Sequence, residues 1–313
     1  MDYKFDSNGT PISISYPRYL FRYTKISDNL MSSIRENYFW FSSITAFNDP
    51  FEACTIIDSD VTDAEVREYL QFIFSEMVKK YPENEMWPLL IANIDLGVDL
   101  ITKDKRTFME FVMSDVTKRL VEGRGIFCLS AVCDSVLMWG HYSDSFSGVC
   151  LVYDFETLVN RALFSPVKVR YVDNAPKYNY IRQRVLSSRE PRPNHVWAHE
   201  TEFDQTVFAT KTTAWQYEQE YRLFSYKQGK NAINPSSLRG IIYGPRISPD
   251  KKAELTTLLK NRPQQVIEVD MRLDSREKTC IVDVFNTETI TRDDVTLFNL
   301  YEVVRRREER NIS

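Results

Sequence analysis

The sequence predicts an α+β fold in which short strands lie before and after a long helical segment. Between residues 62 and 122, apolar side chains recur at the spacing of one helix face. Short aromatic and β-branched runs, bounded by turn residues, occur in residues 19–43 and again after residue 125. Because the sequence contains no repeat and no low-complexity linker, we expect one domain over residues 1–313 with a helical insertion at 60–123.

The first half of the chain is predicted to run from strand to helix to strand, then through a turn into three helices. Ser27 is the expected N-cap of the first helix. Asn48, within an Asn-Asp-Pro sequence, marks the turn. Thr62 followed by Glu65 predicts a capping box at the start of the first long helix. The expected strands are 19–23 and 38–43, and the expected helices are 30–34, 62–82, 86–101 and 104–121.

The second half is predicted to be rich in strands. Ser135 is the expected cap of a short helix that contains Trp139 and His141. Residues 173–200 are polar and interrupted by prolines, which indicates a loop with one amphipathic helix near 178–186. The other expected elements are strands at 125–130, 148–153, 167–172, 222–226, 239–243, 266–270 and 281–284 and helices at 203–213, 248–259 and 293–310.

Composition and charge are those of an ordinary globular protein, with 43% hydrophobic and 27% charged residues. The net charge of −4 does not favour nucleic-acid binding over the whole surface, and a local basic patch stays open. The 5 cysteines are odd in number and scattered, which indicates reduced thiols. No signal-peptide segment and no run of about 18 apolar residues occurs, so we expect a cytoplasmic protein without a membrane span.

Several common active-site signatures are missing from the sequence. His195 and His199 are four residues apart and could share a helix face, but the remaining zinc ligands are missing and we assign no metal. There is no Gly-x-Ser-x-Gly elbow, no Walker loop and no Gly-x-Gly-x-x-Gly fingerprint. A nucleotide ligand would therefore need arginine for its phosphates and aromatic side chains for its rings.

The stretch Trp215–Arg222 combines two carboxylates, three aromatic residues and an arginine. If it is extended, alternate side chains share a face, and Glu218, Glu220 and Arg222 point the same way. Taken alone, this pattern is typical of an edge strand with a solvated charged face. A catalytic strand is the alternative, because charges buried on one face of a strand are costly without a purpose.

Other side chains suited to binding a nucleotide occur at the ends of predicted elements. Arg22 lies on the first strand, and Ser42 and Ser43 end the second. Each of these residues, taken alone, has an ordinary structural explanation. Their joint occurrence with the Glu-x-Glu strand favours a binding site. Further members of the set are Tyr23, Asn48, Trp139, His141 and Tyr142.

The order of these motifs resembles a widespread family of bacterial proteins that is classed as a domain of unknown function. The resemblance covers about residues 19–245 and carries no activity with it. Its motifs are Leu20–Tyr23, Phe41–Ser43, Phe47–Glu52, Cys128–Ser130, Met138–Asp144 with Gly148, and Trp215–Arg222.

The order of parts is also similar to the ADP-ribosyltransferase fold, which implies a split antiparallel β-sheet core. In that fold a first strand carries an Arg or His that holds NAD, a second strand ends in Ser or Tyr near the nicotinamide ribose, and a late strand carries the catalytic Glu, often within Glu-x-Glu. The opening is similar to the members that modify nucleic acids, but Lys25 stands where they have His. The first NAD contact therefore stays open among Arg22, Tyr23 and Lys25.

The resemblance implies a role for each candidate residue. Glu220 would stabilise the positive charge that develops on the ribose when NAD is cleaved, and Glu218 would act as base on the incoming nucleophile. NAD would be the co-substrate. The implied NAD-binding side chains are Arg22 on the pyrophosphate, Ser42 at the nicotinamide ribose, Trp139 or Tyr142 on a ring and Arg222 holding Glu220, with Tyr23, Ser43, Asn48 and His141 nearby.

We therefore expect an NAD-dependent ADP-ribosyltransferase, such as a toxin or phage-defence effector kept in check by an inhibitory partner protein. The acceptor could be RNA, DNA or protein, and the basic Arg305–Arg307 run favours nucleic acid. Two alternatives stay open: a non-enzymatic nucleotide-sensing module of the same fold, and a metal-dependent nuclease that uses Glu52 with the two later glutamates. The transferase interpretation requires Arg22, Ser42, Trp139 and Glu220 to line one cleft.

Overall fold

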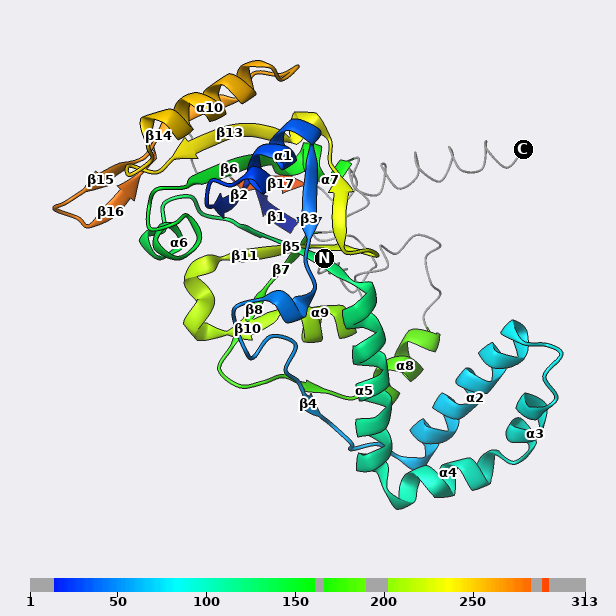
Figure 1. Cartoon of the computed structure of the whole chain (residues 1–313). Helices are drawn as coiled ribbons and strands as arrows, with labels where there is room; N and C mark the ends of the chain where they lie inside the picture. Colours follow the sequence, from blue (N-terminus) through cyan, green and yellow to red (C-terminus); the bar gives the residue numbers. More distant parts are fainter. Residues whose placement is uncertain (1–13, 161–165, 190–201, 283–288, 293–313) are drawn as a thin grey trace. The chain divides into compact units, whose positions relative to one another are not determined.

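The computed structural model describes residues 14–160, 166–189, 202–282 and 289–292. The chain divides into two compact units: the first contains residues 1–47, 124–171 and 211–313, and the second contains 48–123 and 172–210 (Figure 1). The helical insertion expected at 60–123 lies within the second unit, which also includes the later segment 172–210. The helix expected at 293–310 and the pair His195 and His199 lie outside the described residues.

A seven-stranded sheet forms the centre of the first unit. Six of the strands pair antiparallel with their neighbours, but the edge strand β14 runs parallel to β13. The wholly antiparallel core implied by the sequence is therefore wrong at this edge, because the helix α10 (Pro249–Lys260) connects β13 to β14 as a crossover. The strands, in spatial order, are β14 (Ile267–Asp270), β13 (Leu238–Tyr243), β6 (Val149–Asp154), β2 (Tyr19–Thr24), β5 (Gly125–Ser130), β11 (Glu220–Ser225) and β7 (Pro166–Lys168).

The sheet opens between β2 and β5. These two strands are paired at one register position, Phe21 opposite Ser130, whereas β2 pairs with β6 along its whole length. At this opening the guanidinium Nη1 of Arg22 donates a hydrogen bond of 2.8 Å to the backbone carbonyl of Cys128. Arg22 thus adds a side-chain link between two strands that the backbone ladder joins at one register position.

Apolar clusters cover both faces of this sheet, and strand alternation assigns each side chain to a face. Leu20 and Phe127 belong to the larger cluster on one face, with the helices α1 (Asp28–Glu36) and α10. Phe21 and Tyr23 belong to the cluster on the other face, where α6 (Val136–Tyr142) packs. Arg22 alternates with Phe21 and Tyr23, and therefore projects toward the larger cluster.

Helix caps in the first unit follow the sequence prediction. The hydroxyl of Ser27 caps α1 (Asp28–Glu36), and that of Ser135 caps α6 (Val136–Tyr142). The sequence analysis did not predict β12 (Gly229–Ala232), which pairs antiparallel with β3 (Tyr38–Phe41). The other elements of the unit are β1 (Ile14–Pro17) paired with β17 (Thr289–Arg292), β15 (Arg272–Asp274) paired with β16 (Thr279–Ile281), η1 (Ile44–Ala46), η3 (Pro235–Ser237), α7 (Phe155–Asn160) and β8 (Arg170–Val172).

The second unit is mostly helical. Thr62 and Glu65 form the predicted capping box at the start of α2 (Asp63–Lys80). Its buried core includes Val66, Met109 and Ile181, which come from three different helices. The further elements are β4 (Ile56–Ile57) paired with β9 (Lys177–Tyr178), α3 (Met86–Ala92), α4 (Ile94–Lys103), α5 (Lys105–Gly123), α8 (Tyr180–Arg189) and α9 (Glu202–Phe208).

The two helices expected at 86–101 and 203–213 are shorter than predicted. The first is divided at Asn93 into α3 and α4, and the second ends at Phe208 and gives way to the strand β10 (Thr210–Thr212). Over the described parts of both units, no helix has the length and apolar character that crossing a membrane requires.

Gly148 provides a test of the close backbone packing at the start of β6. A Cβ atom there would lie 2.4 Å from the carbonyl oxygen of Thr24 and 2.8 Å from that of Ser143, both of which are fixed by the backbone. We predict that Gly148→Ala lowers the free energy of unfolding by roughly 1–3 kcal/mol. Chemical denaturation followed by circular dichroism measures the change.

Gly140→Ala is the matched control in the same unit. Its Cβ would be 3.9 Å from its nearest neighbour, an atom of the Phe146 ring, and the residue is inside the helix α6. Alanine is the better helix former, so this variant should be as stable as the wild type or more stable by up to about 1 kcal/mol. Equal losses for both variants would contradict the packing argument.

Candidate functional site

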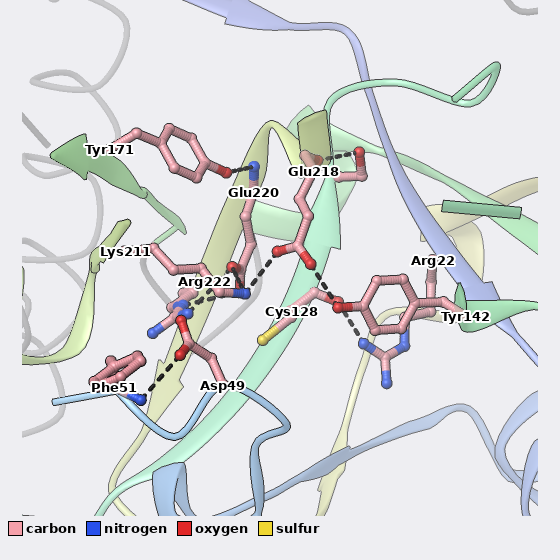
Figure 2. A network of polar contacts seen from close by, with 11 residues as sticks. Arg22, Asp49, Phe51, Cys128, Tyr142, Tyr171, Lys211, Glu218, Glu220 and Arg222 are labelled. Carbon is pink, nitrogen blue, oxygen red and sulfur yellow. Dashed lines mark hydrogen bonds and ion pairs between the residues drawn. The ribbon is translucent and has the colours of Figure 1, made fainter. Parts of the chain in front are cut away.

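A cluster of buried charged side chains lies where the 3₁₀ helix η2 (Thr213–Glu218) passes into β11 (Figure 2). The extended conformation considered for Trp215–Arg222 is therefore wrong for its first half. Gln219, with φ of 42°, adopts the left-handed conformation and turns the chain between Glu218 and Glu220. The two carboxylates consequently approach each other from a helix end and a strand start, not from one strand face.

Lys211 lies between the two carboxylates. Its Nζ is 2.7 Å from Oε2 of Glu218 and 3.3 Å from Oε2 of Glu220, and its side chain is buried. The Nζ also lies 4.6 Å from the centre of the Trp215 ring, a cation–π contact. Lys211 was not predicted from the sequence, because its partners follow it by seven and nine residues and meet it only after the chain reverses at η2.

Arg222 holds the Glu220 carboxylate with two hydrogen bonds. Its Nε and Nη2 donate to Oε1 and Oε2 at 2.8 and 3.1 Å, and the guanidinium is fully buried. The two residues are two positions apart on β11 and share a face, as strand alternation requires. Although burial raises the pKa of Glu220, the charges of Arg222 and Lys211 outweigh it and lower this pKa to about 2.

Glu218 has a contrasting environment. Burial raises its pKa, against the opposing effects of Lys211 and of Tyr142, whose hydroxyl donates to Oε1 at 2.5 Å. Its backbone carbonyl accepts a hydrogen bond of 2.6 Å from the hydroxyl of Ser130, which anchors the end of η2 to β5. The site thus contains one carboxylate that stays ionised and a second that takes up a proton more readily.

Arg22 and Ser42 line a separate pocket of about 390 Å³. Phe127 also lines the pocket, and the guanidinium of Arg22 lies over the Phe127 ring, 4.7 Å from the ring centre. The pocket combines two cations, hydroxyl groups and aromatic rings, which suits an anionic ligand with a planar group. Its remaining lining residues are Thr24, Ser27, Asn29, Leu30, Ser32, Ser33, Tyr38, Phe39, Trp40, Leu151, Tyr153 and Lys230.

Neither Trp139 nor Glu220 lines this pocket, so it is not the single cleft that the sequence interpretation required. Arg22 projects toward the larger apolar cluster, whereas Trp139 and Tyr142 pack in the cluster on the opposite face. Glu220 alternates with Tyr221, a member of the larger cluster, and therefore also faces away from Arg22. The sheet separates two groups of residues that the sequence analysis had placed together.

The other predicted binding residues have different surroundings. Trp139 is fully buried, donates its indole N–H to the Cys133 carbonyl at 2.9 Å and packs edge-on against Tyr23. His141 is exposed, with its ring 6.3 Å from that of Tyr217. Ser43 caps η1. Asn48 belongs to the second unit, as does Glu52.

The described residues hold no group of three or more His, Cys, Asp or Glu side chains that could bind a metal ion. All five cysteines are free thiols. Burial raises the pKa of the Cys128 thiol, which lies opposite Arg222 in the β5–β11 ladder, and the Glu220 charge raises it further. Cys128 is consequently a neutral neighbour of the charged cluster.

Comparison with known proteins identifies one similarity. A sequence family described as "Protein of unknown function (DUF2971)" matches residues 138–223. This segment begins in α6 and ends in β11, so it contains Tyr142, Lys211 and the Glu220–Arg222 pair. No curated protein and no solved structure matches the chain.

Arg222 allows the energetic importance of the cluster to be measured. We predict that Arg222→Met lowers the free energy of unfolding at pH 7 by about 3–5 kcal/mol, because it leaves a buried carboxylate without its closest cation. Denaturant titrations measure this loss. The double variant Glu220→Gln/Arg222→Met should lose less than the single variant, since the uncompensated charge is then absent.

The loss of stability caused by Arg222→Met should also depend on pH. In the wild type the lowered pKa of Glu220 contributes stability above its ordinary pKa of 4.5, and this contribution disappears as the pH falls toward 2. In Arg222→Met that contribution is already lost, so the difference between the two proteins should stay nearly constant from pH 7 to about pH 5 and shrink as the pH falls from 4.5 toward 2. Lys251→Met, which breaks an exposed ion pair with Glu254, is the control and should cost less than about 1 kcal/mol throughout this range. A penalty independent of pH would contradict the charge argument.

Proposed function

We propose that the chain is an NAD-dependent ADP-ribosyltransferase whose reacting carboxylates are Glu220 and Glu218. The observation that carries the proposal is the buried carboxylate pair at the start of β11, in which the pKa of Glu220 is lowered and that of Glu218 is raised. Opposite pKa shifts allow two carboxyl groups of the same kind to play different chemical roles. This arrangement matches a reaction that needs one permanent negative charge and one proton acceptor.

The proposed reaction cleaves the bond between nicotinamide and C1′ of the ribose. Nicotinamide leaves with the bonding electrons, and the ribose develops an oxocarbenium character that the ionised Glu220 stabilises. The acceptor then forms a bond to C1′ through an oxygen or nitrogen atom, and its proton passes to Glu218. The acceptor is a nucleic acid or a protein in this proposal, and no metal takes part.

The similarity to the ADP-ribosyltransferase fold supports the assignment of NAD. The strand of the seven-stranded sheet that comes first in the chain, β2, carries Arg22 at the opening of the sheet, and Ser42 follows β3. Arg22 and Lys230 would contact the pyrophosphate, and an aromatic residue of the pocket would contact a ring. Because this pocket is on the opposite face from the carboxylates, the proposal requires NAD to reach both faces of the sheet, which is least continuous between β2 and β5.

One observation favours a second candidate function, a non-enzymatic nucleotide-sensing module. The pocket of Arg22 and Ser42 has the character of a nucleotide site by itself, and Glu220 does not line it. In this alternative the charged cluster only stabilises the unit. The nuclease alternative has no comparable support among the described residues, since they form no candidate metal site.

We predict that the purified protein releases nicotinamide from labelled NAD and that Glu220→Gln lowers kcat by roughly 100- to 1,000-fold. The neutral amide removes the charge that stabilises the transition state and keeps the side-chain shape. Chromatography of the released nicotinamide measures the rate. Glu254→Gln removes an exposed carboxylate on α10 and should retain the full rate.

Binding measurements separate the two candidates. A sensing module should bind NAD, as measured by calorimetry, without releasing nicotinamide. Arg22→Met should then weaken binding and Glu220→Gln should not. This combination of results would favour the sensing module over the transferase. Equal turnover by the wild type and a folded Glu220→Gln variant would exclude Glu220 from the chemistry.

A further inference from the structure

Lys211 is the one charged member of the cluster that the proposed reaction leaves without a task. It reaches the cluster from β10, while both carboxylates belong to η2 and β11. The Glu220 carboxylate already receives two hydrogen bonds from Arg222. Lys211 lies closer to Glu218, at 2.7 Å compared with 3.3 Å for Glu220, so its main electrostatic partner is Glu218.

Lys211 supplies one of the two positive charges among the four residues Lys211, Glu218, Glu220 and Arg222. Lys211 and Arg222 carry two positive charges, and Glu218 and Glu220 carry two negative charges when both are ionised. Without the lysine, two buried carboxylates would share one guanidinium. Since like charges in a buried site oppose each other's ionisation, the carboxylate farther from Arg222 would take up a proton.

We propose that Lys211 is a positioning residue that keeps Glu218 ionised and oriented as the base of the reaction. Its ammonium group fixes Oε2 of Glu218, while the Tyr142 hydroxyl fixes Oε1. Together, the two contacts hold the Glu218 carboxylate in one orientation beside Glu220. The Trp215 ring, 4.6 Å from Nζ, holds the flexible lysine chain in place. This inference rests on the proposed function, because it assigns Glu218 the role of base.

Other groups around Glu218 bear on its titration. The titratable and charged side chains of the elements packed around it are Lys211 on β10, Tyr142 on α6, Tyr171 on β8, Cys128 on β5, Tyr217 on η2 and Glu220 and Arg222 on β11. Burial raises the pKa of Tyr171 and of Cys128, so both stay neutral at physiological pH. Among these groups Lys211 and Arg222 are the cations; Lys211 donates to the Glu218 carboxylate, and Arg222 donates to the Glu220 carboxylate.

The test is the pH profile of NAD turnover in Lys211 variants. In Lys211→Met the midpoint of the acidic limb of kcat should move up by about 1–3 pH units, because Glu218 then ionises at higher pH. Activity should fall at least about tenfold at pH 7 and recover at alkaline pH, with KM for NAD unchanged. Lys211→Arg should keep the wild-type midpoint, and Lys251→Met is the matched surface control with the wild-type profile.

A merely structural lysine would produce a different result. Loss of kcat at every pH with an unmoved midpoint, in a variant that melts like the wild type, would overturn the proposal. Should Lys211→Met fail to fold, Lys211→Gln keeps a hydrogen-bond donor without the charge and should show the same upward shift. An unmoved midpoint in that folded variant would equally overturn it.

A second readout does not depend on turnover. Carboxyl carbon NMR of the labelled glutamates, assigned with Glu218→Gln, follows the ionisation of Glu218 directly in the wild type and in Lys211→Gln. A midpoint that rises on removal of the lysine charge supports the electrostatic role even if the wild type does not cleave NAD, in which case only the proposed function fails. A midpoint equal in both proteins would overturn the role of Lys211.

Discussion

The free-energy cost of burying charged side chains determines the structure of the first unit around the start of β11. Four ionisable groups, Lys211, Glu218, Glu220 and Arg222, are removed from water together, and each would be expensive to bury alone. Their opposite charges and mutual hydrogen bonds offset that cost only if the chain reverses at Gln219. The left-handed turn, the short helix before it and the start of the strand after it are therefore parts of one electrostatic arrangement.

The opening of the sheet between β2 and β5 creates the second constraint. Arg22 crosses it to the Cys128 carbonyl, and the two faces of the sheet carry different chemistry. One face has a pocket with cations and aromatic rings, and the other has the paired carboxylates. A transferase needs NAD to reach both sites, whereas a sensing module does not.

The family match of residues 138–223 covers the charged cluster and, of the pocket lining, Leu151 and Tyr153. It spans the elements that contribute Tyr142, Lys211 and the carboxylate pair, and it leaves out Arg22 and Ser42. The charged cluster thus lies wholly within the matched segment, whereas most of the pocket lining lies outside it. This distribution is the reason for testing the carboxylates and Lys211 before the pocket residues.

Local chemistry explains what could be predicted from the sequence, and long-range packing explains the rest. Ser27, Ser135 and the Thr62–Glu65 box were identified as caps because each bonds within about one helical turn. The Glu220–Arg222 contact follows from a spacing of two on a strand. Tertiary structure alone decided three further features. These are the residues that share a sheet face with Arg22, the parallel pairing of the edge strand β14 and the position of Lys211. They depend on chain reversals and strand pairings whose partners are distant in the sequence, and the burial of unlike charges selects among them.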